Sequence, residues 1–156
     1  MKAQQTGFTL VELIVVIVIL GVLAAVAIPR YANSTQQARY AMISSVAGSI
    51  RSATVQVQGL YQIASANTGT APSSVTMRNG TTVDVFNGSA AAGLPLATAG
   101  GIDNAIALSP GSGIAYDATT RRFYYTALGT GSCYVQYNPG GTGTTYTITL
   151  AATTTC

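Results

Sequence analysis

The sequence contains no histidine, no tryptophan and few charged residues. Only 7% of its residues are charged, whereas an average soluble domain has roughly 25%. Histidine is the commonest general base and a frequent metal ligand, so its absence removes the usual groups for acid-base and metal catalysis. The composition therefore argues against an enzyme, and we expect no catalytic residue, no metal site and no cofactor.

The few charges are also dispersed along the chain. Seven basic and four acidic residues give a net charge of +3, which is too small to predict nucleic-acid binding. Arg121 and Arg122 precede Phe123, Tyr124 and Tyr125, and this basic and aromatic cluster leaves nucleic acid open as an alternative partner. We interpret the cluster instead as the start of a strand whose aromatic side chains alternate between core and surface.

The sequence has only two cysteines, Cys133 and Cys156, and the second is its last residue. An even count late in the chain, with one cysteine at an end that would otherwise fray, predicts a disulfide bond. Such a bond requires an oxidising compartment, such as the periplasm or the cell surface. Two unrelated buried thiols are the alternative interpretation.

One long hydrophobic run lies near the beginning of the sequence. From Phe8 to Ile28 the only charged residue is Glu12, and as a helix this run would be about 31 Å long, enough to cross a bilayer. The polar stretch before it, residues 1–7, carries Lys2. By the positive-inside rule we expect this end in the cytoplasm and the rest of the chain outside.

The helical pattern continues beyond the apolar run. Gly21 lowers helix propensity and Pro29 removes a backbone donor, so a kink or a meltable stretch is predicted between these two residues. Apolar residues then recur at spacings of three or four, which predicts an amphipathic helix over residues 30–60 and one long helix from near Phe8 to near Gly59. The predicted apolar stripe is Tyr31, Ala38, Met42, Val46, Ile50, Ala53, Val57 and Leu60.

Residues 61–156 have the composition of an antiparallel β-sheet. Asn79-Gly80 lies between two alternating runs, which predicts a two-residue hairpin turn between strands near 74–78 and 81–86. We expect a short helix within Ile102–Leu108, then strands near 113–117, 121–127, 132–138 and 144–151, with a turn at 138–141. The predicted fold class is α+β, a long N-terminal helix packed on an antiparallel sheet, with the two cysteines at neighbouring strand ends.

Glu12 is the unusual residue, because an unpaired carboxylate inside a membrane costs roughly 2.5–3.5 kcal/mol. If the chain were cut between Gly7 and Phe8, an α-ammonium would appear at Phe8, one helical turn from Glu12. In a helical polymer this ammonium could pair with Glu12 of a neighbouring copy and neutralise both charges in an apolar core. We therefore predict an assembly role for Glu12.

These residues resemble a known family. The pattern K-x-x-x-x-G-F-T-L-V-E-L-I from Lys2, followed by an apolar run that ends in Ala-Ile-Pro, resembles the class III signal of type IV prepilins. The resemblance covers residues 2–31 most strongly. It implies that residues 1–7 are a leader of the type IVa class, cleaved after Gly7 by a membrane-embedded prepilin peptidase that also N-methylates Phe8. Residues 8–29 would then be the transmembrane and filament-core helix, and Glu12 the assembly glutamate.

The same resemblance implies the type IV pilin fold and a loop bounded by a disulfide between Cys133 and Cys156. It implies a structural subunit that is stored in the bacterial inner membrane and polymerised by pilus assembly machinery into an extracellular homopolymer, for adhesion or motility. A looser resemblance to mannose-sensitive haemagglutinin-type pilins lies in residues 30–53 and in the tail from Cys133 to Cys156.

Four alternatives remain open. An ordinary secretory signal peptide could be cleaved at Ala25-Val26-Ala27, but it has no use for Glu12. A permanent single-pass anchor with a sheet domain is a second alternative. A pseudopilin of a type II secretion system, or a minor pilin, would carry the same N-terminal signal. Major pseudopilins typically bind calcium in a carboxylate-lined loop, whereas Asp103 and Asp117 are isolated in the sequence, with only Asn104 nearby.

Overall fold

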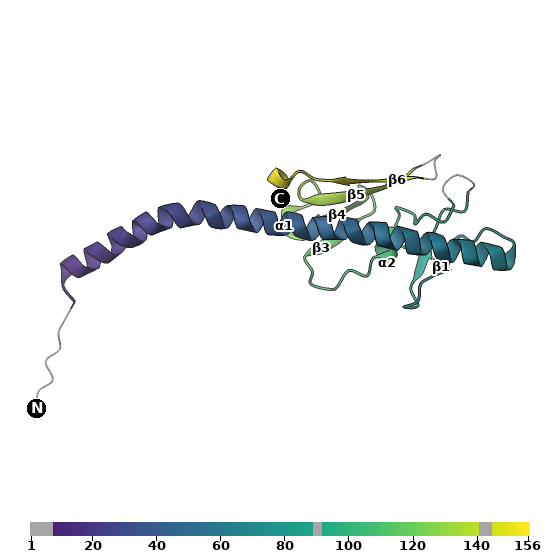
Figure 1. Cartoon of the computed structure of the whole chain (residues 1–156), viewed down its shortest axis with the longest axis horizontal. Coiled ribbons are helices and arrows are strands. Elements are labelled where there is room, and N and C mark those ends of the chain that lie inside the picture. The colour runs from purple at the N-terminus through teal and green to yellow at the C-terminus, as the bar shows by residue number, and fades with distance from the viewer. Residues whose placement is uncertain (1–7, 89–91, 141–144) are drawn as a thin grey trace, which may run out of the picture. The chain divides into compact units, whose positions relative to one another are not determined.

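The computed structural model describes residues 8–88, 92–140 and 145–156. The chain divides into two compact units, residues 1–36 and 37–156. One long helix is followed by a hairpin, a short helix and a four-stranded sheet (Figure 1). The predicted α+β class is confirmed. The predicted leader, residues 1–7 with Gly7, lies outside the described residues.

Helix α1 spans Leu10–Thr68, so it ends later than the predicted end near Gly59. A glycine inside a helix costs only about 1 kcal/mol relative to alanine, and no proline follows Gly59 before the helix ends. The stop comes at Gly69, which has a positive φ of 68° and whose N–H donates to the carbonyl of Ser65 at 2.9 Å. A glycine in this conformation is a common helix terminator, because other residues are strained there.

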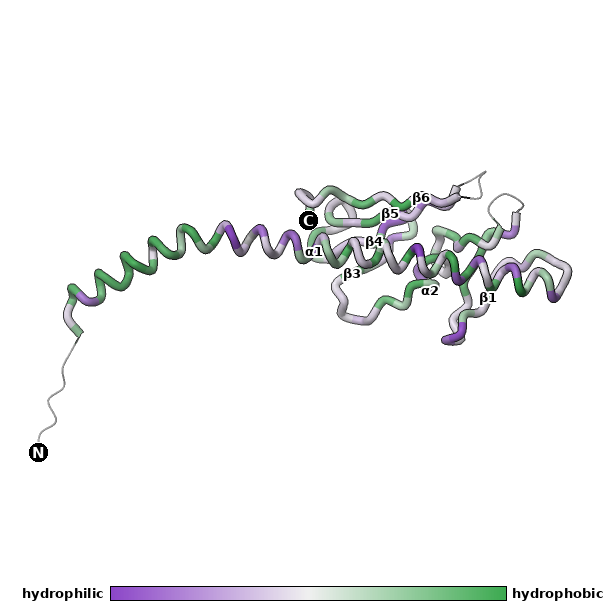
Figure 2. The backbone as a smooth tube through the Cα atoms, viewed as in Figure 1, coloured by the Kyte–Doolittle hydropathy of each residue, from purple (hydrophilic) through white to green (hydrophobic). Residues whose placement is uncertain are grey.

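The first unit consists of the N-terminal part of α1, and its large apolar side chains are all exposed. Between Leu10 and Ile28 their exposed fractions run from 48% to 71%, and the hydropathy colouring is almost continuously apolar there (Figure 2). Within the described residues, α1 is the one helix long and apolar enough to span a membrane. Apolar surface of this extent requires a lipid or protein cover.

In the second unit, α1 packs on the four-stranded sheet between Ile43 and Ala53, and further along it packs on the hairpin through Val57 and Tyr61 (Figure 1). Ile43, Ile50 and their neighbours on this helix face contact Phe123, Val135 and Tyr137 of the sheet. The buried side chains of this helix segment are Ile43, Val46, Ala47, Ile50, Ala53, Thr54, Val57 and Tyr61.

The predicted apolar stripe of α1 is only partly correct. Val46, Ile50, Ala53 and Val57 are buried as predicted, whereas Tyr31, Ala38 and Met42 are exposed. Residue spacing alone predicts this stripe, and the many small residues around it make the adjacent faces of the helix hard to distinguish by sequence. Contact with the sheet selects the face through Ile43 and Ala47 instead.

A hairpin of strands β1 (Ser74–Thr76) and β2 (Thr82–Asp84) forms a separate two-stranded sheet. Its antiparallel register and position are as predicted, but the turn begins one residue early. The N–H of Gly80 donates to the carbonyl of Met77 at 2.9 Å, so Arg78 and Asn79 are the central residues of the turn. Gly80 follows with φ 84°, which is the glycine position of a three-residue hairpin loop and not of the predicted two-residue turn.

Strands β3 (Ile114–Asp117), β4 (Arg122–Tyr125), β5 (Tyr134–Pro139) and β6 (Tyr146–Leu150) form an antiparallel meander in that order, as predicted. Helix α2 (Ile102–Ala105) is a single turn inside the predicted range, and two 3-10 helices, η1 (Thr126–Leu128) and η2 (Thr153–Thr155), follow β4 and β6. Phe123, Val135 and Tyr137 are fully buried on the helix-facing side of the sheet.

Candidate functional site

The N-terminus of α1 is closed by reciprocal hydrogen bonds between Thr9 and Glu12. The N–H of Glu12 donates to Thr9 Oγ1 at 3.3 Å, while the N–H and Oγ1 of Thr9 donate to Glu12 Oε2 at 3.1 and 3.0 Å. This arrangement is a capping box, which satisfies backbone donors that the first helical turn leaves unpaired. The negative charge of Glu12 also lies at the positive end of the helix dipole.

The capping box fixes how Glu12 can interact with a further partner. Among the described residues, both hydrogen bonds to its carboxylate end on Oε2. Oε1 therefore remains able to accept from a cationic group of another molecule. Within the described part of the apolar segment up to Ile28, Glu12 is also the only ionisable side chain, so this end of α1 has one fixed point for a charged partner.

Of the two residues predicted for processing, the structure describes only Phe8. Phe8 precedes the capping box and its side chain is 87% exposed, whereas Gly7 lies outside the described residues. Gly21 and Pro29 both lie within α1. A kink at these two residues stays a prediction, as do cleavage, methylation and the pairing of Glu12 between copies.

The predicted disulfide is present between Cys133 and Cys156, with a Cα–Cα distance of 4.4 Å. Cys133 immediately precedes β5 and Cys156 follows η2, so the bond joins the ends of neighbouring strands. Both residues are buried. The alternative of two unrelated thiols is therefore wrong.

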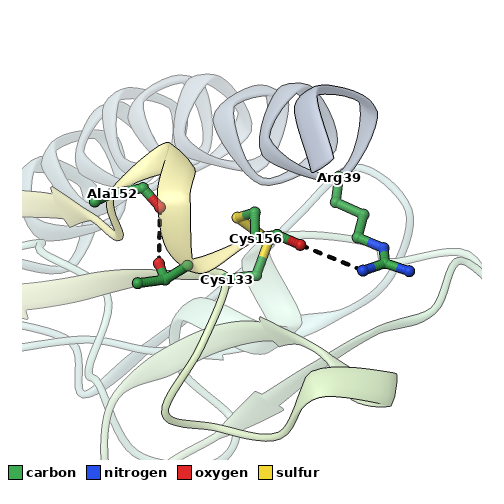
Figure 3. The surroundings of a disulfide bond; sticks show 5 residues. Arg39, Cys133, Ala152 and Cys156 are labelled. Atoms are coloured by element: carbon green, nitrogen blue, oxygen red, sulfur yellow. Dashed lines mark hydrogen bonds between the residues drawn. A yellow bond between two sulfur atoms is a disulfide. The ribbon is translucent and has the colours of Figure 1, made fainter. Parts of the chain in front are cut away.

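Arg39 ties the last residue of the sequence to α1. Its Nη1 donates to the backbone oxygen of Cys156 at 3.3 Å, beside the disulfide (Figure 3). The guanidinium also lies 5.4 Å from the ring centre of Tyr125 on β4, within the range of a cation–π contact. Arg39 thus connects helix, sheet and disulfide within the second unit.

Of the two carboxylates weighed for a calcium site, Asp117 has local hydrogen-bond partners, whereas the buried Oδ1 of Asp103 has none among the described residues. Asp117 accepts from Thr119 N–H at 2.9 Å and from Thr120 Oγ1 at 2.7 Å, and these bonds hold the pKa of its carboxyl below its usual value. Asn104 donates its amide to the carbonyl of Thr82 at 2.9 Å. Over the described ranges, there is no group of three or more His, Cys, Asp or Glu side chains that could hold a metal ion.

The basic and aromatic cluster has the alternation expected of a strand. Phe123 is fully buried, and Arg122 stacks on Tyr134 of β5 at 3.8 Å from its ring centre. Arg122 also donates to the carbonyl of Thr130 at 3.1 Å. These contacts hold the guanidinium against the protein, although its buried Nε has no hydrogen-bond partner among the described residues. They favour the structural interpretation over a nucleic-acid patch.

The sequence analysis missed two residues of this arrangement. Thr9 carries a recognisable signal, because T-x-x-E ahead of an apolar run is the signature of a capping box. Arg39 has no local signal, since its partner Cys156 is 117 residues away in the sequence.

Comparison with known proteins supports the N-terminal resemblance. Residues 2–28 match the family described as the prokaryotic N-terminal methylation motif. The type IV narrow pilus major component PilA5 of Thermus thermophilus is 46% identical over 61 residues, which cover 36% of this chain and 53% of PilA5. The type IV major fimbrial protein FimA of Dichelobacter nodosus is 45% identical over 53 residues, 34% of each chain.

A secretion protein is similar as well. The type II secretion system core protein G of Pseudomonas aeruginosa is 50% identical over 38 residues, 24% of this chain and 27% of that protein. No solved structure matches the chain. The chain spans between about a quarter and about a half of the length of these relatives. The methylation motif over residues 2–28 and the similarity of the N-terminal third of the chain to pilus proteins support a type IV pilin.

Proposed function

We propose that this chain is a structural, non-catalytic subunit of a type IV pilus. Its helix between Leu10 and Ile28 would be stored in the bacterial inner membrane and then packed among copies of itself in an extracellular filament. The observation that carries the proposal is the exposure of every large apolar side chain in this segment together with one capped carboxylate, Glu12. A helix that is apolar on all sides belongs in a lipid or protein interior.

Processing would supply a cationic partner for Glu12. Cleavage between Gly7 and Phe8 by a prepilin peptidase would create an α-ammonium at Phe8, which that enzyme would then methylate. In a filament, the ammonium of one subunit would bind Oε1 of Glu12 in a neighbour, while Thr9 continues to hold Oε2. Such a buried pair would contribute register and selectivity more than stability.

The similarity to a type II secretion core protein supports a second candidate, a pseudopilin. A minor pilin would share the same N-terminal features. The three candidates differ in where the assembled protein is found and in what amount, so the location of the mature chain separates them.

The test is mass spectrometry of the intact protein in material sheared from cells that carry a pilus assembly system. A mature chain that begins at N-methyl-Phe8, with both cysteines oxidised and abundant in the sheared fraction, is the expected result. A chain that begins after Ala27, or that retains Met1, contradicts the proposal. Correct processing confined to envelope fractions supports a pseudopilin or a minor pilin instead.

Two substitutions separate the charge of Glu12 from its capping role. Glu12→Gln keeps a side-chain oxygen that can accept from Thr9, because glutamine also serves in capping boxes, but it removes the charge. Glu12→Ala removes both. We expect both variants to be cleaved and to stay in the membrane with little or no filament formed, and normal filament yield from Glu12→Gln would exclude the ion pair.

A further inference from the structure

The sequence contains two Asn-Gly dipeptides, Asn79-Gly80 and Asn87-Gly88. Asn-Gly is the dipeptide in which the backbone nitrogen of the second residue most readily attacks the asparagine side chain, because glycine carries no side chain to obstruct it. We propose that Asn87 is a site of spontaneous deamidation to aspartate and isoaspartate, whereas Asn79 is protected by its hairpin turn. The inference does not depend on the proposed function.

The reaction needs only water. The nitrogen of Gly88 attacks Cγ of Asn87 and loses its proton, the side-chain nitrogen leaves as ammonia, and a cyclic succinimide remains. Water then opens the ring at either carbonyl and yields an aspartate or an isoaspartate, in which the backbone runs through the former side chain. Each event replaces a neutral amide by a carboxylate, so the net charge of +3 falls by one.

The hairpin engages the attacking nitrogen at Asn79. The N–H of Gly80 donates to the carbonyl of Met77 at 2.9 Å, and the N–H of Thr81 donates to Asn79 Oδ1 at 3.0 Å. The N–H of Met77 in turn donates to the carbonyl of Thr81 at 2.8 Å. Succinimide formation here would break the bond of Gly80 and turn the amide of Asn79 away from Thr81, so the folded hairpin opposes it.

Asn87-Gly88 lies in a different setting. Both residues are exposed, and among the described residues no acceptor is hydrogen-bonded to the N–H of Gly88. The loop is anchored just before the dipeptide, where Phe86 N–H donates to Leu94 at 2.9 Å and its carbonyl accepts from Gly93 at 2.8 Å. The anchors end at Phe86, so the ring can form at Asn87 without breaking a backbone bond of the described fold.

The products would remain compatible with the folded unit. Val85, which precedes the anchor, is buried and bridges to Pro95 across the base of the loop. The new carboxylate and the altered backbone lie beyond that base, on the exposed side. Deamidation would therefore add a negative charge to the surface over time without opening the core beneath it.

The test uses the full chain in detergent micelles at mildly alkaline pH, with peptide mapping by mass spectrometry and an isoaspartate assay. We expect Asn87 to react about tenfold or more faster than Asn79, the ratio that protection by about 1.4 kcal/mol gives. In the same chain unfolded by urea, the two dipeptides should react at similar rates. Equal rates in the folded chain, a faster Asn79, or no reaction at Asn87 while the unfolded chain reacts would each overturn the proposal.

A matched variant tests the attacking nitrogen. Gly88 has open space where a Cβ would lie and its φ is not in the left-handed region, so Gly88→Ala should fold normally. The added methyl group should suppress reaction at Asn87 in both folded and unfolded chains and leave Asn79 unchanged. Unaltered reaction at Asn87 in this variant would also overturn the proposal.

Discussion

Thr9 and Glu12 cap the start of α1 reciprocally, each accepting a hydrogen bond from the backbone N–H of the other at 3.1 to 3.3 Å. The carboxylate of Glu12 is therefore part of the helix end as well as the one charge in the apolar segment. Thr9 holds the carboxylate of Glu12 through Oε2, so the side chain does not rotate freely. This restriction would lower the entropic cost of forming an ion pair with a neighbouring subunit.

The first prediction concerns Thr9. Thr9→Ala should weaken the helix end by about 1 kcal/mol, the typical cost of losing a threonine N-cap. Hydrogen exchange of the Glu12 amide, measured on the full chain in detergent micelles, should become about fivefold faster as a result. Thr9→Ser keeps the hydroxyl and should exchange as the unaltered chain does, while unchanged exchange in Thr9→Ala would show that the capping box contributes nothing.

The second prediction compares two positions on α1. Ile50 is fully buried against the sheet, whereas Val55 is 65% exposed on the other side of the helix. Ile50→Ala should lower the free energy of unfolding by about 2–5 kcal/mol, because it leaves a cavity in the core. Val55→Ala should change it by no more than about 0.5 kcal/mol. Urea unfolding followed by tyrosine circular dichroism measures both, and equal losses would contradict the observed face of the helix.

The sequence predicted those parts of the structure that depend on local patterns. The apolar run, the alternation around β1 to β6 and the two late cysteines were sufficient for the fold class, the sheet order and the disulfide. Local spacing alone did not select the face of α1 that carries Ile43 and Ala47, because this choice depends on contact with a sheet that lies far away in the sequence. The hydrogen bond from Arg39 to Cys156 could not be predicted from the sequence for the same reason.

Two local features were misjudged for other reasons. Asn79-Gly80 fits two loop types, and only the bond from Gly80 to Met77 shows that the glycine follows the turn and is not part of its centre. The predicted end of α1 lies near Gly59, but the helix continues to Thr68 and is ended by the positive φ of Gly69. At the functional end, T-x-x-E was visible in the sequence, and Thr9 could have been predicted from it.

The third prediction concerns the bond between Cys133 and Cys156. Reduction should lower the free energy of unfolding by about 3 kcal/mol, since the bond closes a loop with a sequence separation of 23 and restricts the unfolded chain. The measurement is urea unfolding with and without reductant. A variant with both cysteines changed to alanine should have the unfolding midpoint of the reduced chain, and reductant should not change it. An unfolding midpoint of the unaltered chain that reductant does not shift would contradict the prediction.

The last prediction is a loss of stability at alkaline pH through the partly buried Tyr116 and the fully buried Tyr137. The hydroxyl of Tyr116 donates to the carbonyl of Ala97 at 2.6 Å, and that of Tyr137 donates to the carbonyl of Pro95 at 3.0 Å. Both bonds require the protonated phenol. Burial raises the pKa of Tyr116 to about 12, with a smaller contribution from the charge of Asp103, and burial also raises the pKa of Tyr137.

A pKa that is higher in the folded than in the unfolded state sets the direction of the effect. Unfolded tyrosine titrates near 10.0, so the contribution of Tyr116 is complete below that pH and is lost as the pH rises from about 10 to about 12. The free energy of unfolding should fall across this window, as measured by urea unfolding at successive pH values. Tyr116→Phe should make the fall shallower but not abolish it, because Tyr137 still contributes. The contradicting result is tyrosinate absorbance that develops in one step near pH 10 while the fold stays intact. It would show that neither phenol is protected from ionisation. The hydrogen bonds from Tyr116 and Tyr137 would then not hold the sheet against the segment from Pro95 to Ala97.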